Sequence, residues 1–233
     1  MGNKTGIEWT DATWNPIRGC RRVSNGCEHC YAEAMAHRFS GPGQPYEGLT
    51  QIVNGHPVWT GKVALVEKHL LDPLKDSQMK KPVRNLDGER LCGCDSEHYR
   101  PRRIFVNSMS DLFHPNVPDV WIDRIFAVMA LCPQHIFQVV TKRPERMLAY
   151  FQGFLPPTAE DRAMRTCAWV ADAVAKPPHA WIDSIERVPR GVPNLHLGVS
   201  VEDQATADQR IPLLLQTPAA VRFISADASA WAD

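Results

Sequence analysis

The sequence lacks three features that would place a protein in a class at once: an excess of one charge, a long apolar run and a hydrophobic leader. Its 233 residues hold 26 Lys and Arg against 26 Asp and Glu, for a formal net charge of zero. A neutral chain has no overall attraction to nucleic acid or to an anionic membrane, although a local basic patch remains compatible with either. No apolar segment approaches the length of a membrane span.

Residues 1–8 contain no apolar core of a secretory signal. We therefore expect a cytoplasmic protein whose seven cysteines are reduced, and in that compartment clustered cysteines indicate metal binding or catalysis rather than disulfides. The sequence also has no internal repeat, P-loop, Ser-His-Asp arrangement or zinc-protease helix, and no glycine-rich dinucleotide fingerprint follows its first expected strand.

Short apolar runs alternate with helical patterns along the chain. The runs predict buried strands at Lys62–Glu67, Arg103–Asn107, His135–Thr141, Leu195–Ser200 and Val221–Ser225, with a weaker one at Gly6–Trp9. Helices are expected over Glu28–Phe39, Pro118–Leu131, Pro144–Phe151, Thr158–Ala175 and Glu202–Gln216. This α/β alternation predicts a parallel sheet, and six such strands predict a single (β/α) barrel-like domain, a partial six-strand barrel.

Two segments resemble insertions into this domain. Residues 41–61 are rich in Gly and Pro and predict a loop or lid, and residues 75–102 form a polar, basic stretch. A run of charges is usually a solvated face, and a phosphate-contacting patch is the alternative.

Polar side chains follow the expected strands where each strand ends. They are Ser108 and Asp111, Lys142 and Arg143, and Ser200 and Glu202. In barrels the carboxyl ends of the strands carry the active site, so these side chains predict the lining of a site.

Three cysteines, Cys20, Cys27 and Cys30, are spaced C-x6-C-x2-C and admit three interpretations. A structural zinc ion needs a fourth ligand, from His29 or from the pair Cys92 and Cys94. A redox pair formed by the last two cysteines leaves the first without a role. A [4Fe–4S] cluster normally takes four cysteines, so three thiolates leave one iron open for S-adenosylmethionine (SAM).

The local context favours the cluster. The cysteines are expected to follow the first strand and to precede a helix, which places them at the top of the barrel. Gly19 and Gly26 each precede a cysteine and allow tight turns, and Tyr31 sets an aromatic ring beside the last ligand.

This pattern resembles the radical-SAM superfamily, whose usual loop is C-x3-C-x2-C with an adjacent aromatic residue. The chain more closely resembles an uncharacterised phage and bacterial family encoded near a "three-Cys-motif partner" protein. Besides the cysteine loop, the stretches that carry this likeness are residues 6–16, 106–114, 138–144 and 198–204.

The resemblance implies an enzyme that cleaves SAM, acting on a substrate that the sequence does not identify. Cys20, Cys27 and Cys30 match the cluster ligands, and Glu67 stands where such proteins contact the SAM amino group. The six strand-end residues named above match a cofactor or substrate lining, and a cation at Lys142 or Arg143 suits the SAM carboxylate.

Two further expectations follow from the comparison with that family. Its members continue past the sixth strand, so the ending Ser225-Ala-Asp-Ala-Ser-Ala-Trp-Ala-Asp233 indicates a C-terminally shortened member. The competing hypothesis is a zinc-stabilised, phage-related binding module, which would contact nucleic acid through its basic insertion.

Overall fold

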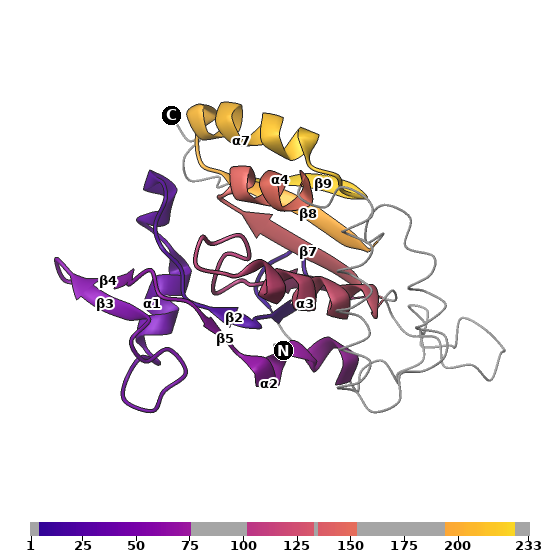
Figure 1. Cartoon of the computed structure of the whole chain (residues 1–233). Coiled ribbons are helices and arrows are strands. Elements are labelled where there is room, and N and C mark those ends of the chain that lie inside the picture. The colour runs from indigo at the N-terminus through magenta and orange to yellow at the C-terminus, as the bar shows by residue number, and fades with distance from the viewer. Residues whose placement is uncertain (1–4, 76–101, 133–134, 153–193, 227–233) are drawn as a thin grey trace, which may run out of the picture.

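The fold is built around a parallel sheet of five strands. The computed structural model describes residues 5–75, 102–132, 135–152 and 194–226. The strands, in spatial order, are β1 (Ala12–Trp14), β6 (Arg103–Val106), β7 (Ile136–Thr141), β8 (Leu195–Val201) and β9 (Val221–Ala226). Every neighbouring pair is parallel, and the sheet forms the centre of the molecule in Figure 1.

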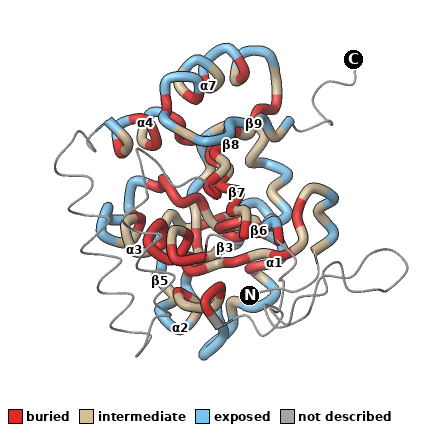
Figure 2. Tube along the Cα trace, turned by 90° about the vertical axis from the view of Figure 1, so that its right-hand side faces the viewer, coloured by how far each residue is buried: buried red, intermediate tan, exposed pale blue. Residues whose placement is uncertain are grey.

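Helices α3 (Asp119–Ala130), α4 (Pro144–Gln152) and α7 (Gln204–Gln216) cover one face of the sheet (Figure 1). On that face the strands contribute fully buried side chains such as Trp14, Val106 and Val139. The buried residues, red in Figure 2, join strands and helices into one apolar core. The carboxyl ends of five strands are thereby held on one rigid scaffold.

The opposite face of the sheet is more polar. Because side chains alternate along a strand, the paired residues Phe105, Gln138 and His196 lie side by side on this face. Trp9 packs there as well, with its ring 4.9 Å from that of Phe105 and 6.0 Å from that of Phe223 in β9.

The strand predictions are confirmed for β6, β7, β8 and β9 and wrong for the other two. Within Lys62–Glu67 only Ala64–Leu65 is a strand (β5), and it pairs antiparallel with Ile17–Arg18 (β2), outside the main sheet. Residues Gly6–Trp9 form no strand, and the first strand is Ala12–Trp14. The main sheet thus has five strands and is open, and the described strands form no closed barrel.

Of the helix predictions, α3, α4 and α7 are confirmed. Asp203 caps α7 by accepting a hydrogen bond from the Thr206 amide at 2.7 Å, and Pro212 lies inside the helix without dividing it. The segment Glu28–Phe39 contains α1 (Tyr31–His37), which follows a short 3₁₀ turn, η1 (Asn25–Cys27).

The buried face of α1 differs from the expected one. The spacing of Ala32, Met35 and Phe39 predicts one apolar face, but Met35 and Phe39 are 42% and 47% exposed. Ala32 is buried as predicted, together with Glu33 and Ala36. The Glu33 carboxylate explains the rotation, because it accepts hydrogen bonds from Arg22 and from a backbone amide of the neighbouring hairpin.

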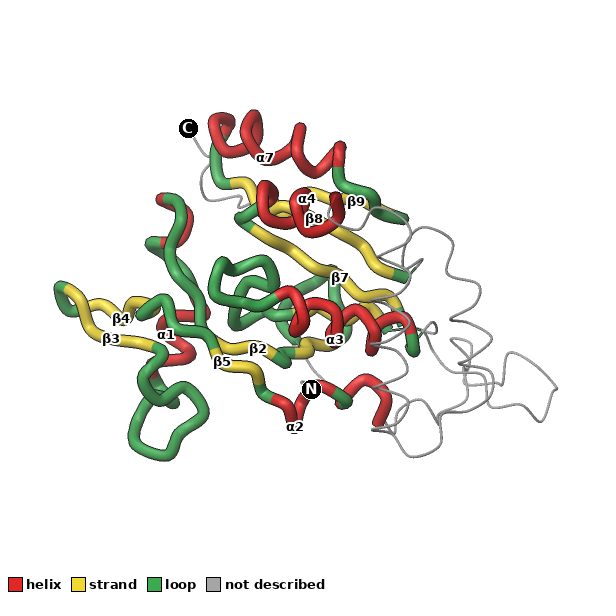
Figure 3. The backbone as a smooth tube through the Cα atoms, viewed as in Figure 1, coloured by secondary structure: helices red, strands yellow, loops and turns green. Residues whose placement is uncertain are grey.

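That hairpin, β3 (Thr50–Val53) and β4 (His56–Trp59), lies in the segment predicted as a loop or lid. Asn54 and Gly55 connect its strands with φ values of 49° and 80°, as a two-residue hairpin turn requires. Figure 3 shows the hairpin projecting from the body of the molecule beside α1.

The remaining described elements are α2 (Glu67–Leu70) and the 3₁₀ turn η2 (Asp72–Lys75). The predicted helix Thr158–Ala175, the pair Cys92 and Cys94, almost all of the basic insertion and residues 227–233 lie outside the described residues. Among the described helices, none is both long and apolar enough to cross a bilayer.

Candidate functional site

The cysteine loop, residues 19–30, lies against the carboxyl edge of the parallel sheet. Gly19 pairs with Ser110, in the segment that follows β6, and adopts a φ of 89°. A Cβ atom on Gly19 would collide with the carbonyl oxygen of Lys62, so only glycine fits there. The backbone carbonyl of Cys20 then accepts a hydrogen bond from the Gly61 amide at 3.1 Å. These contacts fix the start of the loop.

All three cysteines of the loop are partly buried. Cys20 and Cys30 pack against the same small apolar cluster, formed by Ala32, Ala36, Leu49, Trp59 and Met109. Cys30 is also the N-cap residue of α1, and the Cys27 sulfur lies 3.9 Å from the Ser24 hydroxyl. The loop therefore presents its thiols from one short, well-packed segment.

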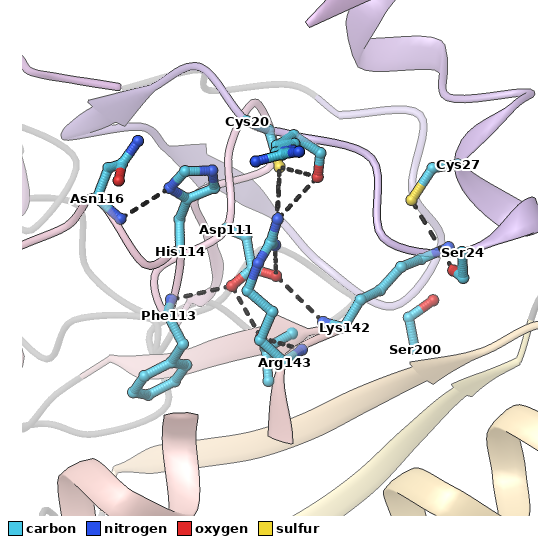
Figure 4. A network of polar contacts seen from close by, with 12 residues as sticks. Cys20, Ser24, Cys27, Asp111, Phe113, His114, Asn116, Lys142, Arg143 and Ser200 are labelled. Carbon is cyan, nitrogen blue, oxygen red and sulfur yellow. Dashed lines mark hydrogen bonds and ion pairs between the residues drawn. The ribbon is translucent and has the colours of Figure 1, made fainter. Parts of the chain in front are cut away.

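A buried ion pair lies directly beside Cys20 (Figure 4). The Arg143 Nη1 atom is 2.7 Å from Asp111 Oδ2, and both guanidinium Nη atoms are 3.9 Å from the Cys20 sulfur. Arg143 Nη2 also donates to the Arg21 carbonyl oxygen at 2.7 Å. The arginine thus connects the end of β7 to the cysteine loop.

The Asp111 carboxylate holds this arrangement by accepting four hydrogen bonds. Besides Arg143, its donors are the Phe113 amide at 2.9 Å, the Thr141 hydroxyl at 2.8 Å and the Lys142 amide at 3.1 Å. Its lone pairs are therefore occupied, and Asp111 is a support for the site rather than a free ligand.

The environment of the thiols controls their protonation. Burial raises the pKa of Cys20 to about 12, and the Asp111 charge adds to this while Arg143 opposes it. Burial likewise raises the pKa of Cys30 above its ordinary value. When no metal group is bound, these two thiols keep their protons. A metal group that binds them as thiolates must therefore release protons on binding.

Glu202 ties the end of β8 to the same loop. Its carboxylate is 2.8 Å from Arg210 and 3.4 Å from Lys142 Nζ. Burial acts to raise its pKa, but hydrogen bonds from Ser24 and Arg210 and the Lys142 charge outweigh this and leave the pKa lowered. A Cβ atom on Gly26 would lie 2.9 Å from the Glu202 side chain, so the loop rests directly on it.

His114, in the loop after β6, is 1% exposed. Its Nδ1 atom accepts a hydrogen bond from the Asn116 amide at 3.1 Å, and the Asn116 side chain reaches the Gly61 carbonyl oxygen. Burial, and then the Arg143 charge, lower the pKa of His114 to about 4. The ring is therefore neutral near pH 7.

Most of the predicted strand-end residues lie at this edge. The Ser108 hydroxyl donates to Asn15 and its carbonyl oxygen accepts from Tyr31, beside the last cysteine. Ser200 faces Lys142 in Figure 4.

The prediction for Glu67 has no structural support. Its side chain is exposed on the first turn of α2, and it shares no hydrogen bond with the site residues that the structure describes.

Sequence patterns gave a signal for two of the supporting residues, because Gly26 directly precedes a cysteine and Thr141 is the polar last residue of an expected strand. They missed Arg210, whose contribution depends on how α7 lies against the end of β8.

A site for a single metal ion can be assessed only among the described residues, which do not include Cys92 and Cys94. In the described ranges, no group of three or more His, Cys, Asp or Glu side chains is arranged to hold one metal ion.

Comparison with protein families gives one match, over residues 4–228, to a model described as "Protein of unknown function (DUF5131)". The chain belongs to the DUF5131 family. This match confirms the prediction that the chain belongs to an uncharacterised family. Neither the comparison with curated proteins nor that with solved structures gave a match.

Proposed function

We propose that this DUF5131 protein is an iron–sulfur enzyme of the radical-SAM type. Cys20, Cys27 and Cys30 would hold a [4Fe–4S] cluster, and SAM would bind beside it. The observation that carries the proposal is the packing of a three-thiol loop onto the carboxyl edge of a parallel sheet, where a buried guanidinium touches the first thiol. Parallel α/β sheets bind their ligands at that edge.

The arrangement of the thiols favours a cluster over a single ion. A mononuclear zinc site needs its ligands gathered around one point, and the described residues form no such group. In a cubane each cysteine binds a different iron. Three thiols on one short loop would each bind one iron and leave the fourth iron open.

Arg143 suits an anionic cluster. A [4Fe–4S] group with thiolate ligands is negatively charged, and burying it beside the Cys20 sulfur requires a nearby cation. Arg143 supplies that cation, and Asp111 and the Arg21 carbonyl oxygen hold its guanidinium in place. The positive charge also favours the thiolate form of Cys20.

Lys142 is the better of the two expected partners for the SAM carboxylate. Arg143 is committed to Asp111 and to the cysteine loop, whereas Glu202, at 3.4 Å, is the one ion-pair partner of Lys142 Nζ among the described residues. The Lys142 side chain is 20% exposed, so an incoming carboxylate reaches it while the pair of Asp111 and Arg143 stays intact. When bound, the reduced cluster supplies the electron that cleaves SAM.

Two further parts of the proposal rest on the sequence. The five strands of the main sheet would belong to a six-strand partial barrel, as the alternation of strands and helices predicts. As the resemblance implies, the protein would also act together with a three-Cys-motif partner protein.

The experiment is SAM cleavage by anaerobically reconstituted, chemically reduced protein, followed as release of methionine and 5′-deoxyadenosine. We expect cleavage by the wild type, and an increase in the KM for SAM of about tenfold in Lys142→Gln, since one charge-assisted hydrogen bond is worth about 1.4 kcal/mol or more. Lys68→Gln, an exposed lysine on α2, is the matched control and should leave the KM unchanged. Cluster-loaded protein that neither binds nor cleaves SAM would contradict the proposal.

A further inference from the structure

His114 places a buried polar atom with no partner in the site. The side chain is 1% exposed, and its Nε2 atom is buried without a hydrogen-bond partner among the described residues. Leaving a buried donor unsatisfied costs about 1–3 kcal/mol. A histidine held in this way needs an acceptor that the described residues do not supply.

The other ring nitrogen decides what Nε2 offers. Nδ1 accepts a hydrogen bond from the Asn116 amide at 3.1 Å, so it carries no proton. A neutral imidazole with an unprotonated Nδ1 has its proton on Nε2. Nε2 is then a hydrogen-bond donor, and it is not available as a metal ligand.

The surroundings of the ring identify the acceptor as an anion. The charged groups that act on His114 are Arg143, Asp111 and Arg21. Asp111 has its own four donors, and Arg143 lies 3.9 Å from the Cys20 sulfur. Figure 4 shows the imidazole on the far side of this pair from Lys142, beside the first cysteine of the loop. An acceptor that arrives at Cys20 therefore enters next to an unsatisfied N–H group.

We propose that His114 donates a hydrogen bond from Nε2 to an inorganic sulfide of the cluster bound at Cys20, since the Cys20 sulfur itself is not a hydrogen-bond partner of Nε2. This inference rests on the proposed function. Hydrogen bonds to the sulfurs stabilise the more negative, reduced cluster and so raise its reduction potential. His114 is thus a positioning and tuning residue that makes the cluster easier to reduce.

The test is the midpoint potential of the cluster, measured by an anaerobic redox titration followed by electron paramagnetic resonance. His114→Phe keeps an aromatic ring of similar size and removes the N–H donor. We expect its potential to fall by about 59 mV or more, which is a tenfold change in the ratio of reduced to oxidised cluster. His114→Gln, which retains an amide donor, should restore part of the shift, and His56→Phe, at an exposed histidine, should change nothing.

A second measurement uses the wild type and does not depend on how the variants fold. After labelling with ¹⁵N-histidine, electron–nuclear double resonance of the reduced cluster should show a weak ¹⁵N coupling that is lost in His114→Phe. Absence of this coupling would overturn the inference, as would equal midpoint potentials in wild type and His114→Phe at equal iron content. A wild type that holds no iron would instead overturn the proposed function itself.

Discussion

Asp111 and Arg143 form a buried ion pair, with 2.7 Å between Oδ2 and Nη1 and only 8% of each side chain exposed. The pair joins the segment after β6 to the end of β7, and through the guanidinium it reaches Cys20. We expect Asp111→Asn to destabilise the metal-free protein by about 3–5 kcal/mol, because it leaves a buried cation without its counter-ion. Urea denaturation measures the change in the free energy of unfolding.

The exposed pair of Arg146 and Asp119 is the matched control. Its nitrogen–oxygen distance is 2.8 Å, but Asp119 is 50% exposed. Asp119→Asn should therefore cost about 1 kcal/mol or less. If the free energy of unfolding falls equally in the two variants, the buried pair of Asp111 and Arg143 stabilises the fold no more than the exposed pair does.

Gly26 tests the contact between the cysteine loop and Glu202. In Gly26→Ala the new methyl group would lie 2.9 Å from three atoms of a side chain that Arg210 holds in place. We expect a loss of about 1–3 kcal/mol in stability from overpacking. Because the loop must shift away from β8, metal retention in a chelator challenge should also fall.

Gly6→Ala provides the comparison for that variant. In the described part of the chain, no atom other than those of its sequence neighbours lies within 4 Å of a Cβ at Gly6, so this change should alter neither stability nor metal retention. A Gly26→Ala protein that matches it would argue against the packing of the loop on Glu202.

The pH dependence of stability reports on His114. Its pKa is about 4 in the folded protein and about 6.5 when unfolded, so the unfolded chain takes up the proton first as the pH falls. The stabilisation that the neutral His114 ring gives to the folded state is complete above pH 6.5. It is lost as the pH falls from 6.5 to 4, and the free energy of unfolding then decreases by up to about 1.4 kcal/mol per pH unit.

Metal-free wild type and His114→Gln should therefore converge in unfolding free energy as the pH is lowered through this window. Parallel curves for the two proteins would mean that His114 takes up its proton equally in both states.

The sequence predicted those parts of the fold that depend on local pattern. The helical spacing of Ile122, Ile125 and Met129 predicted α3, and short apolar runs predicted β6 to β9. The run Lys62–Glu67 has the same composition, but its short strand pairs with Ile17–Arg18 instead of joining the parallel sheet. Composition does not determine which partner a strand finds.

For the candidate site, too, local pattern was predictable and long-range contacts were not. The polar residues at the strand ends predicted that Asp111, Arg143 and Glu202 lie at one edge, because parallel strands end together, and they do. Their partners were not predictable, since the buried Arg143 guanidinium and the Gly26 contact depend on a loop more than one hundred residues away in the sequence. The hairpin could have been predicted, because Asn54-Gly55 between apolar residues is a strong turn signal.

The most direct test of the central claim is the iron and acid-labile sulfide content of anaerobically purified protein. We predict about four irons and four sulfides per chain, as a cubane cluster requires. Cys20→Ala should lose or alter the cluster, while Cys132→Ala, at a buried cysteine outside the loop, should keep it. One tightly held zinc ion without sulfide, or an unchanged cluster in Cys20→Ala, would contradict the account.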